Sequence, residues 1–259
     1  MGATRRILLT ALPKFLLSRS TGLLTRIPLP KFARPIVYGW FARRYGADLS
    51  EMAGKPADYR SMAAFFRRPL RDGQRPIAAD AELVWPCDGK IISSGPITDG
   101  RITQVKGRDY AVEQLLQDRE LAERVDGGFQ MTIYLAPRDY HRVHSPFAGE
   151  VIGTKHIPGK LFPVNPGAVD SIPDLFPRNE RVVFHYRLPS GDDAAVLLVS
   201  ALNVGDTLVT AVPGPIAKGA ELGQFGFGST AIVLTPKRGP AIPDLPRETP
   251  GMMGQGILT

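Results

Sequence analysis

The chain has 259 residues, a formal net charge of +7 and a single cysteine, Cys87. This length suits one domain, or one domain with an appendage, and a hydrophobic content of 43% is enough to form a core. One cysteine excludes an internal disulfide framework and a multi-cysteine metal cluster, and we interpret Cys87 as a buried structural thiol. The 27 glycines and 24 prolines favour short strands and turns over a helical fold.

The positive charge is concentrated at the N-terminus. Residues 1–47 contain nine lysines and arginines and no acidic residue, whereas the other 212 residues carry 23 basic and 25 acidic side chains. The basic balance therefore belongs to an N-terminal arm, and the rest of the chain is close to neutral. Such a nearly neutral body disfavours nucleic-acid binding.

Large apolar residues alternate with the bases of this arm, for example in residues 15–17 and 36–41. The uncharged stretches are too short to span a bilayer, and prolines divide the arm into short helices. Three interpretations remain open: amphipathic helices on an anionic membrane surface, a helical cap packed on the body, and a nucleic-acid-binding arm. We favour the membrane surface, because the high aliphatic content argues against nucleic acid.

The body is expected to be rich in strands. Short helices are expected over 59–69 and 110–118, and strands over 90–94, 101–106, 129–135, 149–157, 181–188, 195–201, 207–212 and 230–235. No β-α-β rhythm is present, so we predict an α+β fold whose mostly antiparallel, sandwich-like or barrel-like body follows a helical N-terminal segment that faces a membrane. Its parts would be the basic amphipathic segment 1–70, a β-rich domain over 71–236 with the candidate catalytic residues, and an extended or mobile Pro-rich tail, 237–259.

One glycine-rich stretch places Ser229 directly after Gly228, between two apolar runs. No lysine stands directly before Ser229, so the stretch is not a phosphate-binding loop. Glycine leaves its carbonyl sterically open, and a neighbouring hydroxyl could attack that carbonyl if the backbone were strained and a base were present. The alternative is a plain bulge in a strand.

Two other short motifs carry groups for such chemistry. His141 and His144 lie three residues apart in a loop between two strands, where acid–base chemistry, a metal site and structural hydrogen bonding all remain open. His156 and His185 alternate with apolar neighbours and are interpreted as structural. Asp88, in an Asp-Gly pair, is either a simple turn residue or the acid that orients a histidine which activates a serine.

Taken together, these motifs resemble the phosphatidylserine decarboxylase proenzymes of the bacterial, membrane-associated type. The resemblance extends from about Phe41 to Pro236. It includes the stretches 41–46, 65–67, 75–77, 86–89, 140–149, 158–165, 179–183 and 218–230, of which His-Arg-Val-His and Gly-Ser-Thr are specific when Asp-Gly lies upstream. Phe227 stands where leucine is common in the family, a conservative change.

The resemblance implies self-cleavage between Gly228 and Ser229. Ser229 would attack the Gly228 carbonyl and become a covalent pyruvoyl group, which leaves a β chain of residues 1–228 and an α chain of residues 229–259. His144 matches the family's general base and Asp88 its orienting carboxylate.

The same resemblance implies the second reaction. The pyruvoyl ketone would form a Schiff base with phosphatidylserine and yield phosphatidylethanolamine, without a metal or pyridoxal phosphate. His141 matches the family histidine for substrate handling and decarboxylation, and Arg142 could contact the phosphodiester on grounds of charge alone. A homodimer, peripheral on the cytoplasmic side of the cell (inner) membrane, and no nucleic-acid partner are implied as well.

Three alternatives differ from this interpretation in testable ways. A related pyruvoyl decarboxylase could act on a soluble amino acid, although a soluble substrate needs no basic, apolar arm. A serine hydrolase with the same three residues would stay a single chain. A non-catalytic membrane-binding scaffold would not depend on Ser229.

Overall fold

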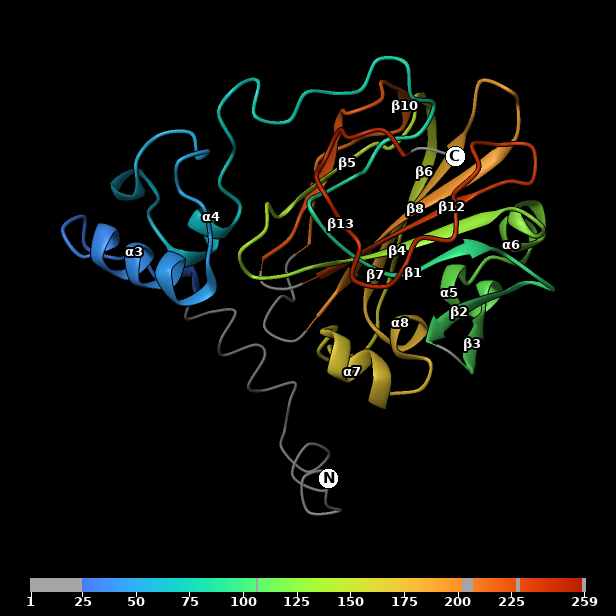
Figure 1. The fold of residues 1–259 in the computed structure, drawn as a ribbon, viewed down its shortest axis with the longest axis horizontal. Coiled ribbons are helices and arrows are strands. Elements are labelled where there is room, and N and C mark those ends of the chain that lie inside the picture. The colour runs from blue at the N-terminus through green and yellow to red at the C-terminus, as the bar shows by residue number, and fades with distance from the viewer. Residues whose placement is uncertain (1–24, 106, 202–206, 227–228, 258–259) are drawn as a thin grey trace.

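The computed structural model describes residues 25–105, 107–201, 207–226 and 229–257. A small helical unit lies to one side of a larger β body (Figure 1). The helical unit consists of α3 (Arg34–Tyr45), the 3-10 helix η1 (Pro56–Asp58) and α4 (Met62–Phe66). The elements of the body are, in chain order, β1 (Gly89–Pro96), β2 (Arg101–Val105), β3 (Arg108–Ala111), α5 (Val112–Leu116), α6 (Arg119–Val125), β4 (Phe129–Leu135), β5 (Arg142–His144), β6 (Gly149–Ile157), α7 (Pro166–Ser171), α8 (Leu175–Arg178), β7 (Arg181–Arg187), β8 (Asp193–Ser200), β9 (Leu208–Val209), β10 (Gly214–Ile216), β11 (Glu221–Gln224), β12 (Ser229–Thr235) and β13 (Pro250–Gly251).

An eight-stranded antiparallel sheet forms the centre of the body, with the strand order β10-β6-β7-β8-β12-β4-β1-β13. A second sheet has the order β5-β11-β9, and β2 pairs with β3. The predicted α+β class with a mostly antiparallel body is confirmed, and each strand expected from the sequence has a counterpart, with the same ends for β4 and β6 and shifted ends for the others. Eight elements of the body were not expected, because β3, β5, β10, β11, β13, α6, α7 and α8 extend the fold beyond the runs that the sequence marks.

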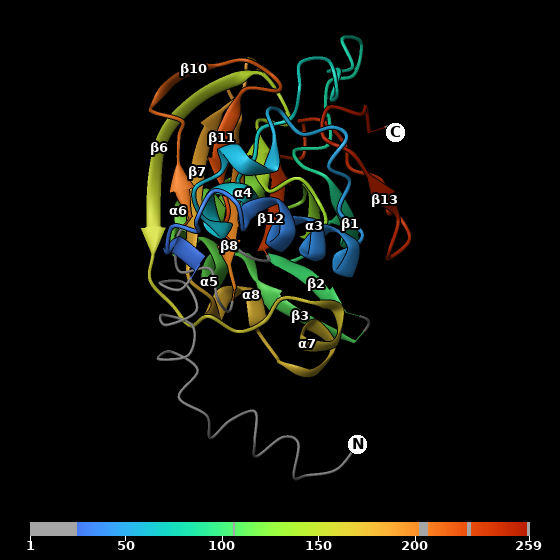
Figure 2. The same ribbon diagram turned by 90° about the vertical axis from the view of Figure 1, so that its left-hand side faces the viewer.

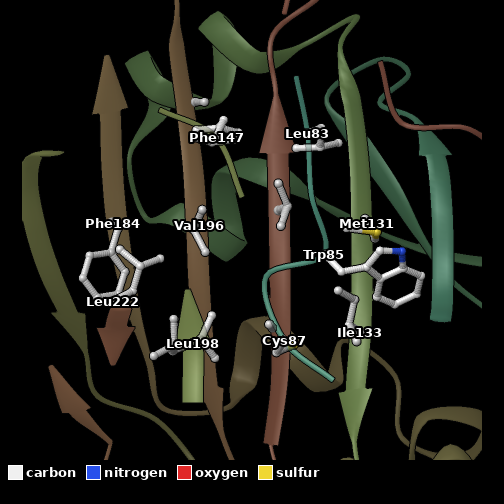
Figure 3. Close-up of a cluster of buried hydrophobic side chains, with 14 of the residues drawn as sticks. Leu83, Trp85, Cys87, Met131, Ile133, Phe147, Phe184, Val196, Leu198 and Leu222 are labelled. Carbon is white, nitrogen blue, oxygen red and sulfur yellow. The ribbon is translucent and has the colours of Figure 1, made fainter. Parts of the chain in front are cut away.

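The centre of the large sheet is buried on both faces. Every residue of β8 and β12 is buried, so side chains that alternate along these strands enter two different cores. Val196 and Leu198 of β8 belong to the core that also contains Val143 of β5 and Leu222 of β11. Figure 3 shows part of this core, which the three-stranded sheet covers.

The opposite face of the sheet is covered by helices. Leu197 of β8 belongs to a second core together with Leu115 of α5, Leu121 of α6 and Phe176 of α8. The strands β2 and β3 close the same core through Ile102 and Tyr110. The body is therefore a three-layer arrangement in which the central sheet separates two hydrophobic cores.

The helical unit has a small core of its own. Tyr38 and Phe41 of α3 pack against Phe65 and Phe66 of α4, and the rings of Tyr38 and Phe65 stack with centroids 4.4 Å apart. Gly46 ends α3 in the left-handed conformation, with φ of 75°. The expectation of helices in the N-terminal segment thus holds for its described part, whereas residues 1–24 of the basic arm lie outside the described residues.

The described part of the Pro-rich C-terminal segment is extended and packed against the body. Gly251 of β13 pairs with Gly89 of β1, and Ile242, Met253 and Ile257 are buried. Of the two alternatives for this tail, extended or mobile, residues 237–257 take the extended one, and they are packed on the body because apolar side chains of this segment enter the first core. The domain boundaries themselves stay a prediction.

Within the residues that the structure describes, no helix has both the length and the hydropathy to cross a bilayer.

Candidate active site

Sheet register places the predicted catalytic residues near one end of β4. Tyr134 pairs with Lys90 of β1 on one side and with Thr230 of β12 on the other. Asp88 directly precedes β1 and Ser229 begins β12, so these two residues flank the C-terminal end of β4. The loop that follows β4 carries His141 and leads to His144, at the end of β5.

His144 is tied to both of the neighbouring segments. Its backbone N–H donates to Pro86 O at 2.7 Å, two residues before Asp88. Its Nδ1 lies 2.8 Å from Gly219 O, and because a carbonyl only accepts, Nδ1 must carry the proton. Nε2 then has a lone pair, which accepts a hydrogen bond from Tyr140 Oη at 3.2 Å. Burial lowers the pKa of His144, so the ring is a neutral base at neutral pH.

Asp88 is held by other groups. Arg75 donates to it from Nε at 2.9 Å and from Nη2 at 2.6 Å, and the backbone N–H of Met253 donates at 2.9 Å. Arg75 also reaches Glu51 with Nη2 at 2.8 Å, so one guanidinium joins two carboxylates. Among the described residues Asp88 therefore has no hydrogen bond to His144, and Gly219 O fixes the histidine tautomer instead. The catalytic role of Asp88 stays a prediction.

Ser229 is completely buried, and its Oγ has no hydrogen-bond partner among the described residues. Leaving a buried hydroxyl unpaired costs about 1–3 kcal/mol. Thr230 and Thr235 of the same strand also have a buried hydroxyl without a partner among the described residues. Gly228, the other half of the predicted cleavage site, and Phe227 lie outside the described residues.

His141 is also completely buried. Its Nδ1 donates to Asp139 O at 2.7 Å, whereas its Nε2 has no hydrogen-bond partner among the described residues. Its ring packs edge-on against Phe66 of α4, with centroids 4.3 Å apart. Burial lowers the pKa of His141 to about 3, so this imidazole is neutral at any physiological pH.

Arg142 connects β5 to neighbouring segments. Its Nη1 donates to Glu221 Oε2 at 2.7 Å, and its Nε and Nη2 donate to Arg67 O at 3.1 and 2.9 Å. These contacts attach β5 to β11 and to the end of α4. The suggestion that Arg142 contacts a phosphodiester stays untested.

The remaining histidines and the cysteine take part in local contacts. His156 Nε2 lies 3.3 Å from Glu180, and His185 Nε2 lies 3.4 Å from Asp193. Cys87 is completely buried in the first core, where burial raises the pKa of its thiol, in keeping with a structural role (Figure 3). Within the described residues, no group of three His, Cys, Asp or Glu side chains is placed to hold a metal ion.

Sequence reasoning did not single out four groups that contact the predicted catalytic residues. Arg75 lies 13 residues before Asp88, and no spacing rule connects the two. The partners from Gly219 and Met253 are main-chain atoms, which leave no mark in a sequence. Tyr140 lies within the histidine motif, and its position four residues before His144 is the only signal that could have indicated it.

Within the described residues, a buried serine whose hydroxyl has no hydrogen-bond partner and two buried, neutral histidines lie on an α+β scaffold. A family model described as phosphatidylserine decarboxylase matches residues 62–259. The chain therefore belongs to the phosphatidylserine decarboxylase family, and it is a decarboxylase, a carbon–carbon lyase.

Curated relatives named phosphatidylserine decarboxylase proenzyme are similar to this chain over most of their length. The one from Anaeromyxobacter sp. (strain K) is 44% identical over 247 residues, which cover 87% of each chain. That of Myxococcus xanthus (strain DK1622) is 39% identical over 250 residues, 89% of each chain. That of Pseudomonas aeruginosa (strain LESB58) is 42% identical over 247 residues, 86% of this chain and 85% of the relative.

Proposed function

We propose that this chain is a self-processing, pyruvoyl-dependent decarboxylase that converts phosphatidylserine to phosphatidylethanolamine and CO₂ in phospholipid biosynthesis. The observation that carries the proposal is the buried, unpartnered Oγ of Ser229. It occurs at the position to which the sequence assigns the cleavage serine, in a chain whose relatives are named proenzymes.

Processing begins when Ser229 Oγ attacks the Gly228 carbonyl. The peptide C–N bond breaks, an ester forms, and the Oγ proton moves to a base. His144 fits that base, because its Nδ1 proton is fixed by Gly219 O and its Nε2 lone pair already accepts a hydrogen bond from a hydroxyl, that of Tyr140.

Elimination then completes the cleavage. Loss of the Cα proton of Ser229 and rupture of its Cβ–O bond release residues 1–228 with a new carboxylate. The dehydroalanine left at position 229 takes up water and loses ammonia, which gives the pyruvoyl group. The two chains would stay together, because residues 229–235 form β12 in the middle of the central sheet.

The residues of the site fit a pyruvoyl group at position 229. Burial of Ser229 keeps water away from an electrophile formed there. Such a group supplies a ketone for the substrate amine and takes up the electron pair released as CO₂ leaves. His141 acts on the substrate through Nε2, which is unprotonated when Nδ1 donates to Asp139 O.

A surface on α3 and on the turn before it supports peripheral binding to the anionic, cytoplasmic side of the cell membrane. Phe32, Ile36 and Trp40 are exposed, and Arg43 and Arg44 lie in the last turn of the helix. Figure 2 shows α3 on the outside of the molecule, in front of the β body. Aromatic and aliphatic side chains enter a lipid surface while arginines contact its headgroups.

The variant Ser229→Ala tests the proposal, because it removes the attacking oxygen and the precursor of the pyruvoyl group. We expect an uncleaved chain on denaturing gels and no phosphatidylethanolamine from phosphatidylserine vesicles. Ser200→Ala is the matched control, because Ser200 on β8 is the cross-strand neighbour of Ser229 on β12. The chain of this control variant should be cleaved normally. Unchanged phosphatidylethanolamine production by Ser229→Ala would refute the proposal.

A further inference from the structure

Arg68, two residues beyond the end of α4, is a buried cation without a carboxylate partner. It is 2% exposed, and it takes part in none of the salt bridges between described residues. Its Nη2 has one long contact, 3.4 Å to Arg138 O, whereas Nε and Nη1 have no hydrogen-bond partner in the described parts of the chain. Its guanidinium carbon lies 5.3 Å from the ring centre of Phe65. Two desolvated, unpaired donors on a cation are costly, and an aromatic neighbour does not replace an anion.

The position of Arg68 relates it to the candidate active site. Its Nη2 contact is to the loop between β4 and β5, the loop that also carries His141. The neighbouring Phe66 packs on the His141 ring, and the positive charge of Arg68 contributes to the lowered pKa of His141. A cation with two free donors and an imidazole with a free Nε2 are therefore in the same neighbourhood.

Two other arginines near the site already form ion pairs with carboxylates. Arg75 uses Nε, Nη1 and Nη2 on Asp88, Glu51 and the Gln74 carbonyl. Arg142 uses its three nitrogens on Glu221 and on the Arg67 carbonyl. Compared with these two, Arg68 is the guanidinium that can accept an anionic ligand without breaking an existing ion pair.

We propose that Arg68 binds the phosphodiester group of the phospholipid headgroup, an inference that rests on the proposed function. A guanidinium presents parallel N–H donors at the spacing of two phosphate oxygens. The substrate carboxylate is the other anion available, but its charge disappears as CO₂ leaves. A cation bound to it would stabilise the ground state more than the transition state, whereas a phosphodiester keeps its charge throughout.

The experiment compares Arg68→Gln and Arg68→Lys with Arg71→Gln, which removes the same charge from an exposed arginine three residues further along the chain. Chain cleavage is followed by intact mass. The kcat and KM values are measured with dihexanoylphosphatidylserine, and the inhibition constant is measured for dihexanoylphosphatidylethanolamine. This product analogue keeps the phosphodiester and lacks the carboxylate.

We expect Arg68→Gln to be cleaved normally. Its KM and its inhibition constant should rise together by about tenfold to a hundredfold, the loss expected for a charged hydrogen-bonded contact, while kcat changes less than about threefold. Arg68→Lys should recover part of the affinity for both ligands, and Arg71→Gln should match the wild type. If Arg68→Gln does not fold, the same joint shift in Arg68→Lys carries the test.

Three results would overturn the proposal. An unchanged KM in cleaved Arg68→Gln or Arg68→Lys would show that Arg68 is structural. A raised KM with an unchanged inhibition constant would assign Arg68 to the carboxylate. A loss of kcat alone would assign it to the chemical step. Failure of the proposed function is a separate outcome, in which cleaved wild type and cleaved Arg71→Gln both produce no phosphatidylethanolamine.

Discussion

At the scale of single residues, main-chain carbonyls hold the two histidines of the site. Nδ1 of His141 donates to Asp139 O, and Nδ1 of His144 donates to Gly219 O. In both rings the proton is thereby fixed on Nδ1 and the lone pair on Nε2. Burial lowers the pKa of each, so both are neutral acceptors at neutral pH without a carboxylate beside the ring.

Burial of His141 predicts a pH-dependent stability. Its pKa is about 3 in the folded chain, against an ordinary value of 6.5, so between these values the unfolded chain binds more protons. Stability should therefore fall as the pH drops below about 6.5, with a His141 contribution that approaches about 1.4 kcal/mol per pH unit. His141→Asn keeps a donor for Asp139 O, and its free energy of unfolding should fall less steeply as the pH drops.

Urea unfolding between pH 4.5 and 7.5 measures this difference. The Ser229→Ala background keeps the chain in one piece during the measurement. His156→Asn is the control, because His156 is exposed and should leave the slope unchanged. If the free energy of unfolding depends on pH equally in His141→Asn and in the parent, the proton that is taken up on unfolding does not belong to His141.

The candidate site could be predicted only in part from the sequence. Asp88, His144 and Ser229 lie in short motifs, and the sheet register brings Asp88 and Ser229 to opposite sides of β4. The contacts between them could not be predicted, because Arg75 occupies both oxygens of Asp88. Three-dimensional packing decides which of several polar groups a side chain reaches, and a backbone carbonyl such as that of Gly219 has no residue type to identify it.

At the scale of elements, the C-terminal segment packs against the residues that precede β1, including Asp88 of the candidate site. Gly254 N–H donates to Trp85 O at 2.9 Å, and Met253 N–H donates to Asp88. At Gly251 an added Cβ would lie 2.1 Å from Trp85 Cε2, so only glycine fits at this position of β13. The segment thus packs directly over residues that precede β1.

Gly251→Ala should push β13 away from Trp85. We expect a loss of about 1–3 kcal/mol in stability, the range for overpacking, and slower self-cleavage because the Met253 contact to Asp88 loosens. Thermal unfolding and a cleavage time course measure both effects. Gly153→Ala in β6 is the matched control, since no atom lies within 4 Å of its added Cβ. Equal behaviour of the two variants would contradict a close packing of β13.

Elements with a strong local signal could be predicted, and those that depend on packing could not. The strands β8 and β12 are long apolar runs, buried along their whole length. The helices α7 and α8 have six and four residues and contain proline, so tertiary contacts rather than propensity stabilise them. Strand β13 is short and follows a series of prolines, which resembles an unstructured tail when read from sequence alone.

At the scale of the whole molecule, the excess of positive charge lies in the N-terminal segment, close to exposed aromatic side chains. The nine bases of residues 1–47 lie in a stretch without acids, and the described part of this stretch includes α3. Phe32 is 79% exposed and Trp40 is 58% exposed. A body of nearly balanced charge attached to such a helix is suited to binding a lipid surface from one side.

The double variant Phe32→Ser, Trp40→Ser should weaken binding to vesicles that contain phosphatidylglycerol by about tenfold or more. Each large side chain that enters an apolar environment contributes about 1.5–3 kcal/mol. Co-sedimentation measures the binding, and thermal unfolding should be unchanged because both side chains are exposed. Val212→Ser, at another exposed apolar position, is the control. Equal binding by the double variant and the wild type would contradict a role for α3 in lipid binding.

Intact mass of the purified chain under denaturing conditions tests the central claim of self-processing most directly. The account predicts two chains that divide between Gly228 and Ser229, with a smaller chain that lacks a free amine at its N-terminus and with Ser229→Ala remaining whole. A wild-type enzyme that decarboxylates phosphatidylserine as a single, uncleaved chain of 259 residues would contradict it.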